Sequence, residues 1–154
     1  MRGWLYGLHF FGHRDTPRIA ELILKEKIIY LIENKNVDKF YVGNNGNFDF
    51  MVRKTLESIK QKYTHIVYFI VLAYMPGKTI TFDYSNTIYP DGLECVHRKY
   101  AIYKRNLWMI SKADYVIGYV NKNIGGAAKF MDIAKRKKKN VINIADMWKN
   151  AWLK

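Results

Sequence analysis

The sequence predicts a Rossmann-like, three-layer α/β/α sandwich, with a mostly parallel sheet of about five strands between two layers of helices. Strand-like and helix-like segments alternate along the chain in the order β-α-β-α-β-loop-α-β-α-β. Alternation of this kind is typical of a parallel sheet with helices on both faces. The chain has 154 residues, of which 49% are hydrophobic, and it shows no repeat or linker. We therefore expect a single domain that spans residues 1–154.

The first half of the chain contains three of the expected strands and two of the helices. The apolar segment 5–11 is the first strand, and the first helix runs from Pro17 to Glu33 with Thr16 as its N-cap. Residues 39–42 form a short strand, and residues 65–74, the longest apolar run, form a central buried strand. The helix between these two strands has one apolar stripe, which consists of Phe48, Val52, Leu56 and Ile59.

The second half begins with residues 75–97, which show no sustained period and contain proline and glycine turns. We expect a long loop there, and such loops often cover binding sites. Next we expect a helix over 99–112, a strand over 115–120, a helix from Gly125 to about Lys138, a strand over 141–145 and a short amphipathic tail over 146–154.

The net charge of +13, from 26 Lys and Arg against 13 Asp and Glu, favours anionic partners. Nucleotides, nucleic acids and acidic lipid headgroups all belong to that class. The densest basic run, residues 135–139, falls where a helix should end, and cations there complement the helix dipole. Because the charges look spread along the chain, binding of nucleic acid is possible but is not the favoured interpretation.

Cys95 is the one cysteine of the chain, so no intramolecular disulfide forms, and we expect a cytoplasmic protein. No stretch approaches the length that spans a membrane, and residues 1–11 lack the cleavage site of a signal peptide. We expect no metal or cofactor and no membrane partner. Trp148 and Trp152 lie four residues apart, so we expect a homo-oligomer that uses them, or else their docking on their own sheet.

Three turns at strand ends carry residues that suit a ligand, which binds beyond the carboxyl ends of parallel strands. The first turn offers an arginine and the free N–H groups of the following helix, and it contains Gly12, His13 and Arg14. The second has a flexible backbone and an acceptor for a ribose hydroxyl, and it contains Gly43, Asn44, Asn45, Gly46 and Asp49. The third is a candidate phosphate cradle, made of Gly125, Gly126 and Ala127.

Each of these turns is also compatible with ordinary turn chemistry, but three of them at one edge indicate a binding site. Arg105, on the helix before the fourth strand, is an additional cation. Tyr84 and Tyr89 on the long loop are candidates for a lid over a base, with core packing as the alternative.

Several motifs of the chain resemble those of the SLOG superfamily, in particular of its small bacterial or phage members. Residues 8–14, LHFFGHR, resemble their opening strand with its GHR signature, and residues 43–49, GNNGNFD, resemble their GG-x-G-x-D turn. Residues 105–117 resemble the segment that leads into the glycine motif of that superfamily. The resemblance extends from Leu5 to Ile144, which is nearly the whole chain.

The superfamily includes the Lonely Guy phosphoribohydrolases, sensor domains for NAD-derived signals and the Rossmann core of DNA-processing protein A. The resemblance implies that Arg105 stands at a catalytic arginine position, with Asn106 beside it. The GGxGTxxE motif of those enzymes matches residues 125–132, where Lys129 replaces the Thr and Asp132 the Glu. The shorter side chain of Asp132 weakens the catalytic part of the match, since positioning carries much of the rate.

Three functions remain open. The favoured one is a sensor or sequestering protein for a nucleotide or an ADP-ribose-like or NAD-like molecule. The second is a phosphoribohydrolase that uses Asp132 or Asp49 together with Arg105, and the third is a binder of single-stranded nucleic acid. The expected ligand-binding residues are Gly12, His13, Arg14, Gly43, Asn44, Asn45, Gly46, Asp49, Arg105, Asn106, Gly125, Gly126, Ala127 and Lys129.

Overall fold

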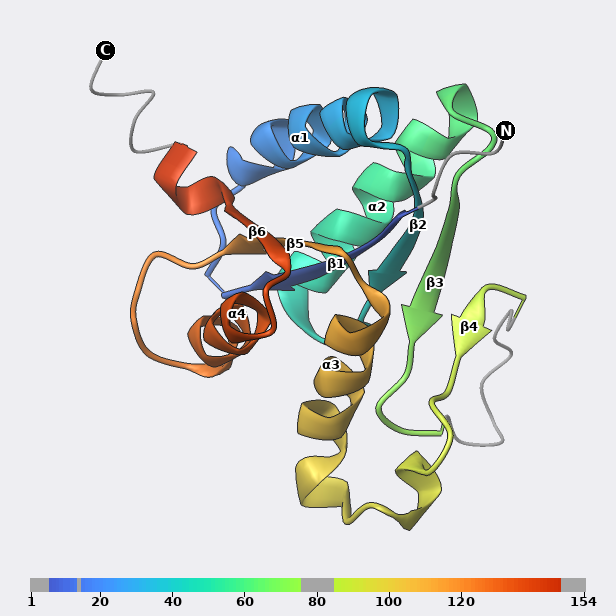
Figure 1. Cartoon of the computed structure of the whole chain (residues 1–154), viewed down its shortest axis with the longest axis vertical. Coiled ribbons are helices and arrows are strands. Elements are labelled where there is room, and N and C mark those ends of the chain that lie inside the picture. Colours follow the sequence, from blue (N-terminus) through green and yellow to red (C-terminus); the bar gives the residue numbers. More distant parts are fainter. Residues whose placement is uncertain (1–5, 14, 76–84, 148–154) are drawn as a thin grey trace.

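Six parallel strands form one sheet in the order β4-β3-β2-β1-β5-β6. The computed structural model describes residues 6–13, 15–75 and 85–147 (Figure 1). The strands are β1 Tyr6–Gly12, β2 Val37–Val42, β3 Val67–Val71, β4 Thr87–Ile88, β5 Tyr115–Tyr119 and β6 Asn140–Asn143. The helices are α1 Ala20–Lys35, α2 Gly46–Lys62, α3 Ala101–Lys112 and α4 Gly126–Arg136, with the short 3-10 helices η1 Leu93–Cys95 and η2 Arg98–Tyr100.

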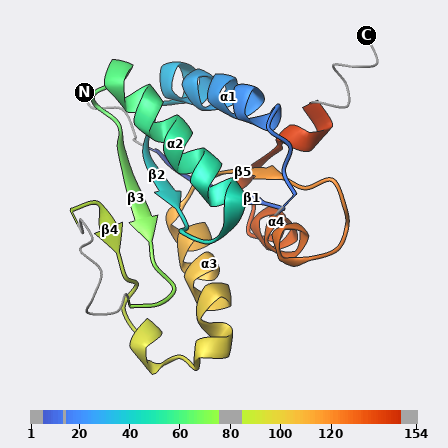
Figure 2. The ribbon, with the colours of Figure 1, turned by 180° about the vertical axis from the view of Figure 1, so that it is seen from behind.

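Helices cover both faces of this sheet, which confirms the predicted three-layer α/β fold. Successive side chains of β1 point to opposite faces: Leu8 and Phe10 join the core under α1 and α2, whereas Phe11 joins the core under α3 and α4. Figures 1 and 2 show the two helix pairs on the two sides of the strands. The connections therefore change face between β1 and β5, the kind of switch point beside which open α/β sheets bind ligands.

The sheet has one strand more than expected, because β4 lies inside the segment that was predicted to be a long loop. β4 is only two residues long and pairs with the carboxyl end of β3. The N–H of Ile70 donates to the carbonyl of Asn86 at 2.8 Å, and that of Leu72 donates to Ile88 at 2.8 Å. A strand of two residues leaves no periodic pattern in a sequence, so it escapes detection.

The first helix begins at Ala20, three residues later than the predicted first helical position, Pro17, and the N-cap assigned to Thr16 is wrong. The Thr16 hydroxyl instead donates to the carbonyl of His13 at 2.6 Å and closes the β1–α1 turn. The N–H of Ala20 donates to the carbonyl of Pro17 at 3.0 Å, and the next two N–H groups form similar bonds. The N–H groups of Ala20, Glu21 and Leu22 are therefore used within this turn and are not available to a ligand.

The last strand ends at Asn143, two residues earlier than predicted, and residues 144–147 are helical. The side chain of Asn143 ends the strand: its Oδ1 accepts from the N–H groups of Val120 and Ala145, and its Nδ2 donates to the carbonyl of Val120. Trp148 and Trp152, on which the expected oligomer depends, lie outside the described residues. Among the described residues, no helix is both long enough and apolar enough to cross a membrane.

Candidate functional site

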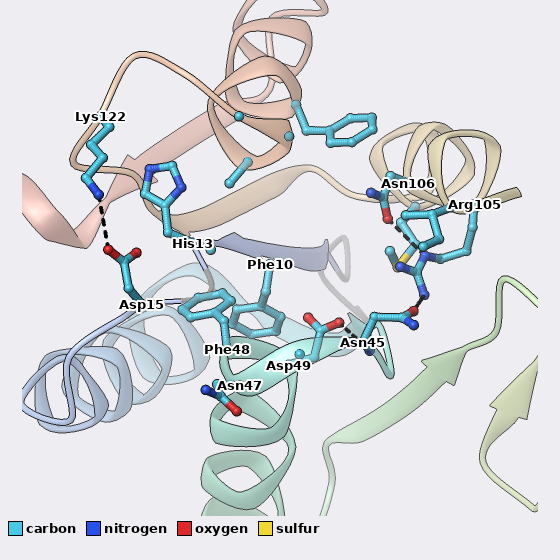
Figure 3. A pocket seen from close by; sticks show the side chains of 18 of the residues that line it. Phe10, His13, Asp15, Asn45, Asn47, Phe48, Asp49, Arg105, Asn106 and Lys122 are labelled. Atoms are coloured by element: carbon cyan, nitrogen blue, oxygen red, sulfur yellow. Dashed lines mark hydrogen bonds and ion pairs between the residues drawn. The ribbon is translucent and has the colours of Figure 1, made fainter. Parts of the chain in front are cut away.

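A cavity of about 530 Å³ lies at the carboxyl end of β1. Its walls are the β1–α1 turn, the amino ends of α2 and α4, and one side of α3 (Figure 3). Ten of the predicted site residues line this cavity, and they are Gly12, His13, Asn45, Gly46, Asp49, Arg105, Asn106, Gly125, Gly126 and Ala127. The fold thus brings residues from all three predicted turns and from α3 to one place.

Arg105 forms one end of the cavity, and its side chain is only 3% exposed. Its Nε donates to Asn106 Oδ1 at 2.9 Å, and its Nη1 donates to the carbonyl of Val71 at 3.0 Å and to Asn45 Oδ1 at 3.1 Å (Figure 3). Within the described part of the chain, no carboxylate lies within ion-pair distance of the guanidinium, and Nη2 makes no hydrogen bond. A buried cation held by neutral oxygens has charge and donor capacity left for an anionic ligand.

Asp49 lies near Arg105 in the first turn of α2. Its Oδ2 accepts the backbone N–H of Asn45 at 3.0 Å, and this bond fixes the turn before the helix. Burial raises the pKa of the Asp49 carboxyl, while the Asn45 hydrogen bond, Arg105 and Arg53 act in the opposite direction. The Asp49 carboxylate is therefore a hydrogen-bond acceptor whose pKa is higher than that of an ordinary aspartate.

Gly43 allows the end of β2 to pass close to both of these charged groups. A Cβ at this position would lie 2.5 Å from Asp49 Oδ2 and 3.1 Å from Arg105 Nη1. Asn44 follows, and its Oδ1 is 3.5 Å from Arg105 Nη1. Gly43 and Asn44 do not line the cavity themselves. They contact Arg105 and Asp49, so this part of the predicted second turn acts mainly by positioning those two side chains.

The amino end of α4 forms another part of the cavity wall. Gly125, with φ of 95°, precedes the helix, and its carbonyl accepts the first intrahelical bond from Lys129 at 3.2 Å. Among the described residues, the earlier N–H groups of Gly126, Ala127 and Ala128 have no backbone acceptor. Free N–H groups together with the positive end of the helix dipole make this position suitable for a phosphate.

Aromatic side chains also line the cavity. Gly12 makes this possible, because a Cβ there would lie 2.2 Å from the Phe48 ring, which crosses the end of β1. Phe10 and Phe130 also contribute to the apolar lining, together with Ile102, Met109 and Ile124. His13 also lines the cavity, and its Nε2 is buried without a partner among the described residues.

Lys122 and Asp15 were not predicted to belong to the site, yet both line the cavity and form an ion pair with 3.2 Å between Nζ and Oδ2 (Figure 3). The ion pair connects the β5–α4 loop to the β1–α1 turn. Lys122 lowers the pKa of the Asp15 carboxyl, mainly through this hydrogen bond. The sequence did contain a signal for this ion pair: Asp15 and Lys122 carry opposite charges, and they lie in two turns that were expected at the same edge of the sheet.

Other predicted residues lie elsewhere. The ammonium group of Lys129 lies over the Tyr103 ring, with its Nζ 4.8 Å from the ring centroid. Asp132 lines a separate cavity of about 410 Å³. Asp132 follows Phe130 by two residues, or roughly 200° of helical rotation, so the two side chains leave α4 in nearly opposite directions. Tyr89 packs against the α1–α2 core instead of lining the site. Arg14 and Tyr84 lie outside the described residues.

A scan against known protein families finds no match for the chain, and a search among characterised proteins finds no similar sequence. The function is therefore inferred from the geometry of the site.

Proposed function

We propose that this protein binds a nucleotide or a nucleotide-derived molecule in the cavity at the carboxyl edge of its sheet, as a sensor or sequestering protein. One observation carries the proposal: a single cavity is lined by the free N–H groups of α4, by aromatic side chains and by the buried Arg105, which has no carboxylate partner among the described residues. A ligand with acceptor groups at both ends and an apolar body between them matches this arrangement.

The phosphate of the ligand belongs at the amino end of α4. The N–H groups of Gly126 and Ala127 are the first donors there, and Lys122 supplies a nearby positive charge. The positive φ of Gly125 favours glycine, and Gly126 has nothing within 4 Å of the position of a Cβ. Both glycines therefore leave room for an anion to approach the backbone.

The sugar belongs at the Arg105 end, and the base belongs on the aromatic lining. Arg105 Nη2 can donate to a ring or hydroxyl oxygen or to a second phosphate, and Asp49 can accept from a ribose hydroxyl. The Phe48 ring offers a flat apolar surface to a base or a ribose. The positions of Arg105 and the glycine pair agree with membership of the SLOG superfamily, which forms part of this proposal.

A second candidate function, hydrolysis of an N-glycosidic bond, has support from Asp49. Such a reaction needs a carboxyl group near the sugar, and a raised pKa suits a group that exchanges protons. Asp49 lies in the same cavity as Arg105 and has a raised pKa, whereas Asp132 lines another cavity. If the protein is a phosphoribohydrolase, its catalytic carboxylate is therefore Asp49.

Thermal unfolding with added ligands tests the proposal. We expect AMP, ADP-ribose or NAD to stabilise the protein, by about 2.7 kcal/mol at a concentration of 100 times Kd. Adenosine, which lacks the phosphate, should stabilise it much less at the same concentration. Equal melting temperatures with and without all phosphorylated ligands would contradict the proposal. Chromatography of the same mixtures for free base then separates binding from hydrolysis.

A further inference from the structure

The positive charge of this protein is concentrated on one layer of the sandwich, contrary to the even spread expected from the sequence. Residues 98–139, which include α3 and α4, contain twelve Lys and Arg but only two acidic residues, Asp114 and Asp132. Residues 18–62, which include α1 and α2, contain nine Lys and Arg against six Asp and Glu. The α3–α4 layer therefore carries most of the excess charge.

Five of these cations gather at the amino edge of the sheet, away from the cavity. They are Lys112 at the end of α3 and Arg136, Lys137, Lys138 and Lys139 at the end of α4. The two helix ends are neighbours because β5 pairs with β6: the N–H of Asn140 donates to the carbonyl of Asp114 at 3.0 Å. We refer to these five residues as the basic edge.

Within the part of the chain that the structure describes, no acidic side chain pairs with the basic edge. The Lys112 ammonium stacks over the half-buried ring of Trp108 at 5.6 Å, which adds an aromatic surface to the positive charges. Proteins that bind single-stranded nucleic acids combine these two components: the cations contact the phosphates, and the aromatic ring stacks on a base.

Lys138 gives an independent indication that the basic edge has a function. The end of α4 is a Schellman turn, in which the N–H of Lys139 donates to Ala134 and that of Lys138 donates to Lys135, both at 3.0 Å. In this turn Lys138 has φ of 58°, in the left-handed region that favours glycine. A lysine at this position costs stability relative to glycine, and the charge that it provides offers a reason for its presence.

We propose that the basic edge, together with the Trp108 ring, binds the backbone of a single-stranded nucleic acid. A membrane surface fits less well, because membrane binding also needs exposed apolar anchors. The exposed large apolar side chains of this layer are Tyr100, Ile102 and Ile124, which lie at or near the amino ends of α3 and α4, toward the opposite edge of the sheet. The inference concerns a different surface from the cavity and does not depend on the proposed nucleotide site.

Fluorescence anisotropy with a labelled 15-nucleotide DNA strand tests this inference over a range of salt concentrations. The substitutions Lys112→Gln, Arg136→Gln and Lys137→Gln are combined in one variant, and Lys25→Gln, Lys35→Gln and Lys62→Gln in a control with the same net charge. We expect the logarithm of the association constant to depend less steeply on the logarithm of the salt concentration in the basic-edge variant. The slope should become shallower by about 2, because three phosphate contacts are lost. The control should keep most of the affinity, and both variants should bind AMP like the unmodified protein.

Lys138→Gly separates binding from folding. Because glycine relieves the left-handed strain, we expect the melting temperature to rise by about 2 °C. The loss of one phosphate contact should weaken DNA binding about fivefold at 0.1 M salt. Equal loss of binding in the basic-edge variant and the control would overturn the inference, since net charge alone would then explain it. Tighter binding to vesicles of anionic lipid than to the DNA strand would also overturn it.

Discussion

Arg105 and Asp49 share one cavity but are connected through Asn45 rather than by a direct ion pair (Figure 3). The backbone N–H of Asn45 donates to Asp49 Oδ2 at 3.0 Å, while Asn45 Oδ1 accepts from Arg105 Nη1 at 3.1 Å. The asparagine thus holds two opposite charges near each other without neutralising either. A ligand that brings an anionic group to Arg105 and a hydroxyl group to Asp49 would satisfy both.

Gly43→Ala should disturb this arrangement. The added methyl group would lie 2.5 Å from Asp49 Oδ2 and 3.1 Å from Arg105 Nη1, so both side chains must move. We expect a loss of stability of about 1–3 kcal/mol, as overpacking usually costs, and weaker nucleotide binding. Urea unfolding and calorimetric titration with AMP measure the two effects. Unchanged affinity in the variant would show that Arg105 and Asp49 do not touch the ligand.

Asp49→Asn and Asp132→Asn distinguish the two carboxylates that the family resemblance left open. Asp49 lines the Arg105 cavity, and Asp132 does not. We expect Asp132→Asn to leave nucleotide affinity unchanged and Asp49→Asn to alter it. If the protein releases free base from AMP, the rate should fall in Asp49→Asn by at least tenfold, because the carboxyl group acts in the reaction. The opposite pattern in a base-release assay would assign the site to the other cavity.

His9 should make the stability of the protein depend on pH. It is fully buried, its Nδ1 lies 2.9 Å from the carbonyl of Tyr41, and its Nε2 has no partner among the described residues. Burial lowers the pKa of His9 from 6.5 to about 3. The folded protein therefore holds His9 neutral, while the unfolded chain takes up a proton below pH 6.5, so stability is complete above pH 6.5 and falls as the pH drops toward 3.

The size of this effect follows from proton linkage, which gives about 1.4 kcal/mol per pH unit for one group below pH 6.5. His9→Phe keeps a ring against Phe11, whose centroid lies 4.1 Å from that of His9, and removes the titrating group. Urea unfolding of both proteins between pH 7.5 and 5 measures the difference. Parallel stability curves over this range would contradict the buried neutral imidazole.

Asp15→Asn should tighten the binding of phosphate groups. Asp15 is an exposed carboxylate at the rim of the cavity and holds Lys122 in an ion pair. The substitution removes a negative charge that repels the ligand and frees Lys122 to bind it. We expect a lower Kd for AMP in Asp15→Asn, a higher one in Lys122→Gln and no change in the control Asp91→Asn. An unchanged Kd in the first two variants would place the phosphate elsewhere.

The sequence predicted the fold well because the four α-helices and the longer strands leave recognisable apolar patterns. The stripe of Phe48, Val52, Leu56 and Ile59 is buried as expected, and the glycine pair at 125–126 begins a helix. The two-residue β4 and the 3-10 turn before α1 have no such pattern. The position of β4 depends on backbone hydrogen bonds to β3, and that of the turn depends on bonds between residues three apart. The preferences of single residues do not encode such bonds.

The candidate site was only partly predictable from the sequence. Glycine and asparagine turns marked three strand ends, and parallel strands bring such ends to one edge. The direction of side chains on α4 was harder to predict, and neither Lys129 nor Asp132 lines the cavity. Phe10 and Phe130 look like ordinary core residues in the sequence, because a residue that lines a cavity has the same apolar pattern as one that fills the core.

The most direct test of the central claim is a calorimetric titration of Arg105→Ala with AMP and ADP-ribose, next to Arg98→Ala as a matched control. Arg98 is an exposed arginine that stacks on Tyr74 and does not line the cavity. Charge-assisted hydrogen bonds contribute about 1.5–3 kcal/mol, so the Arg105 variant should bind at least tenfold more weakly while its circular dichroism spectrum stays that of the folded protein. Arg98→Ala should bind normally. Equal Kd values for Arg105→Ala and the unmodified protein would contradict the proposed site.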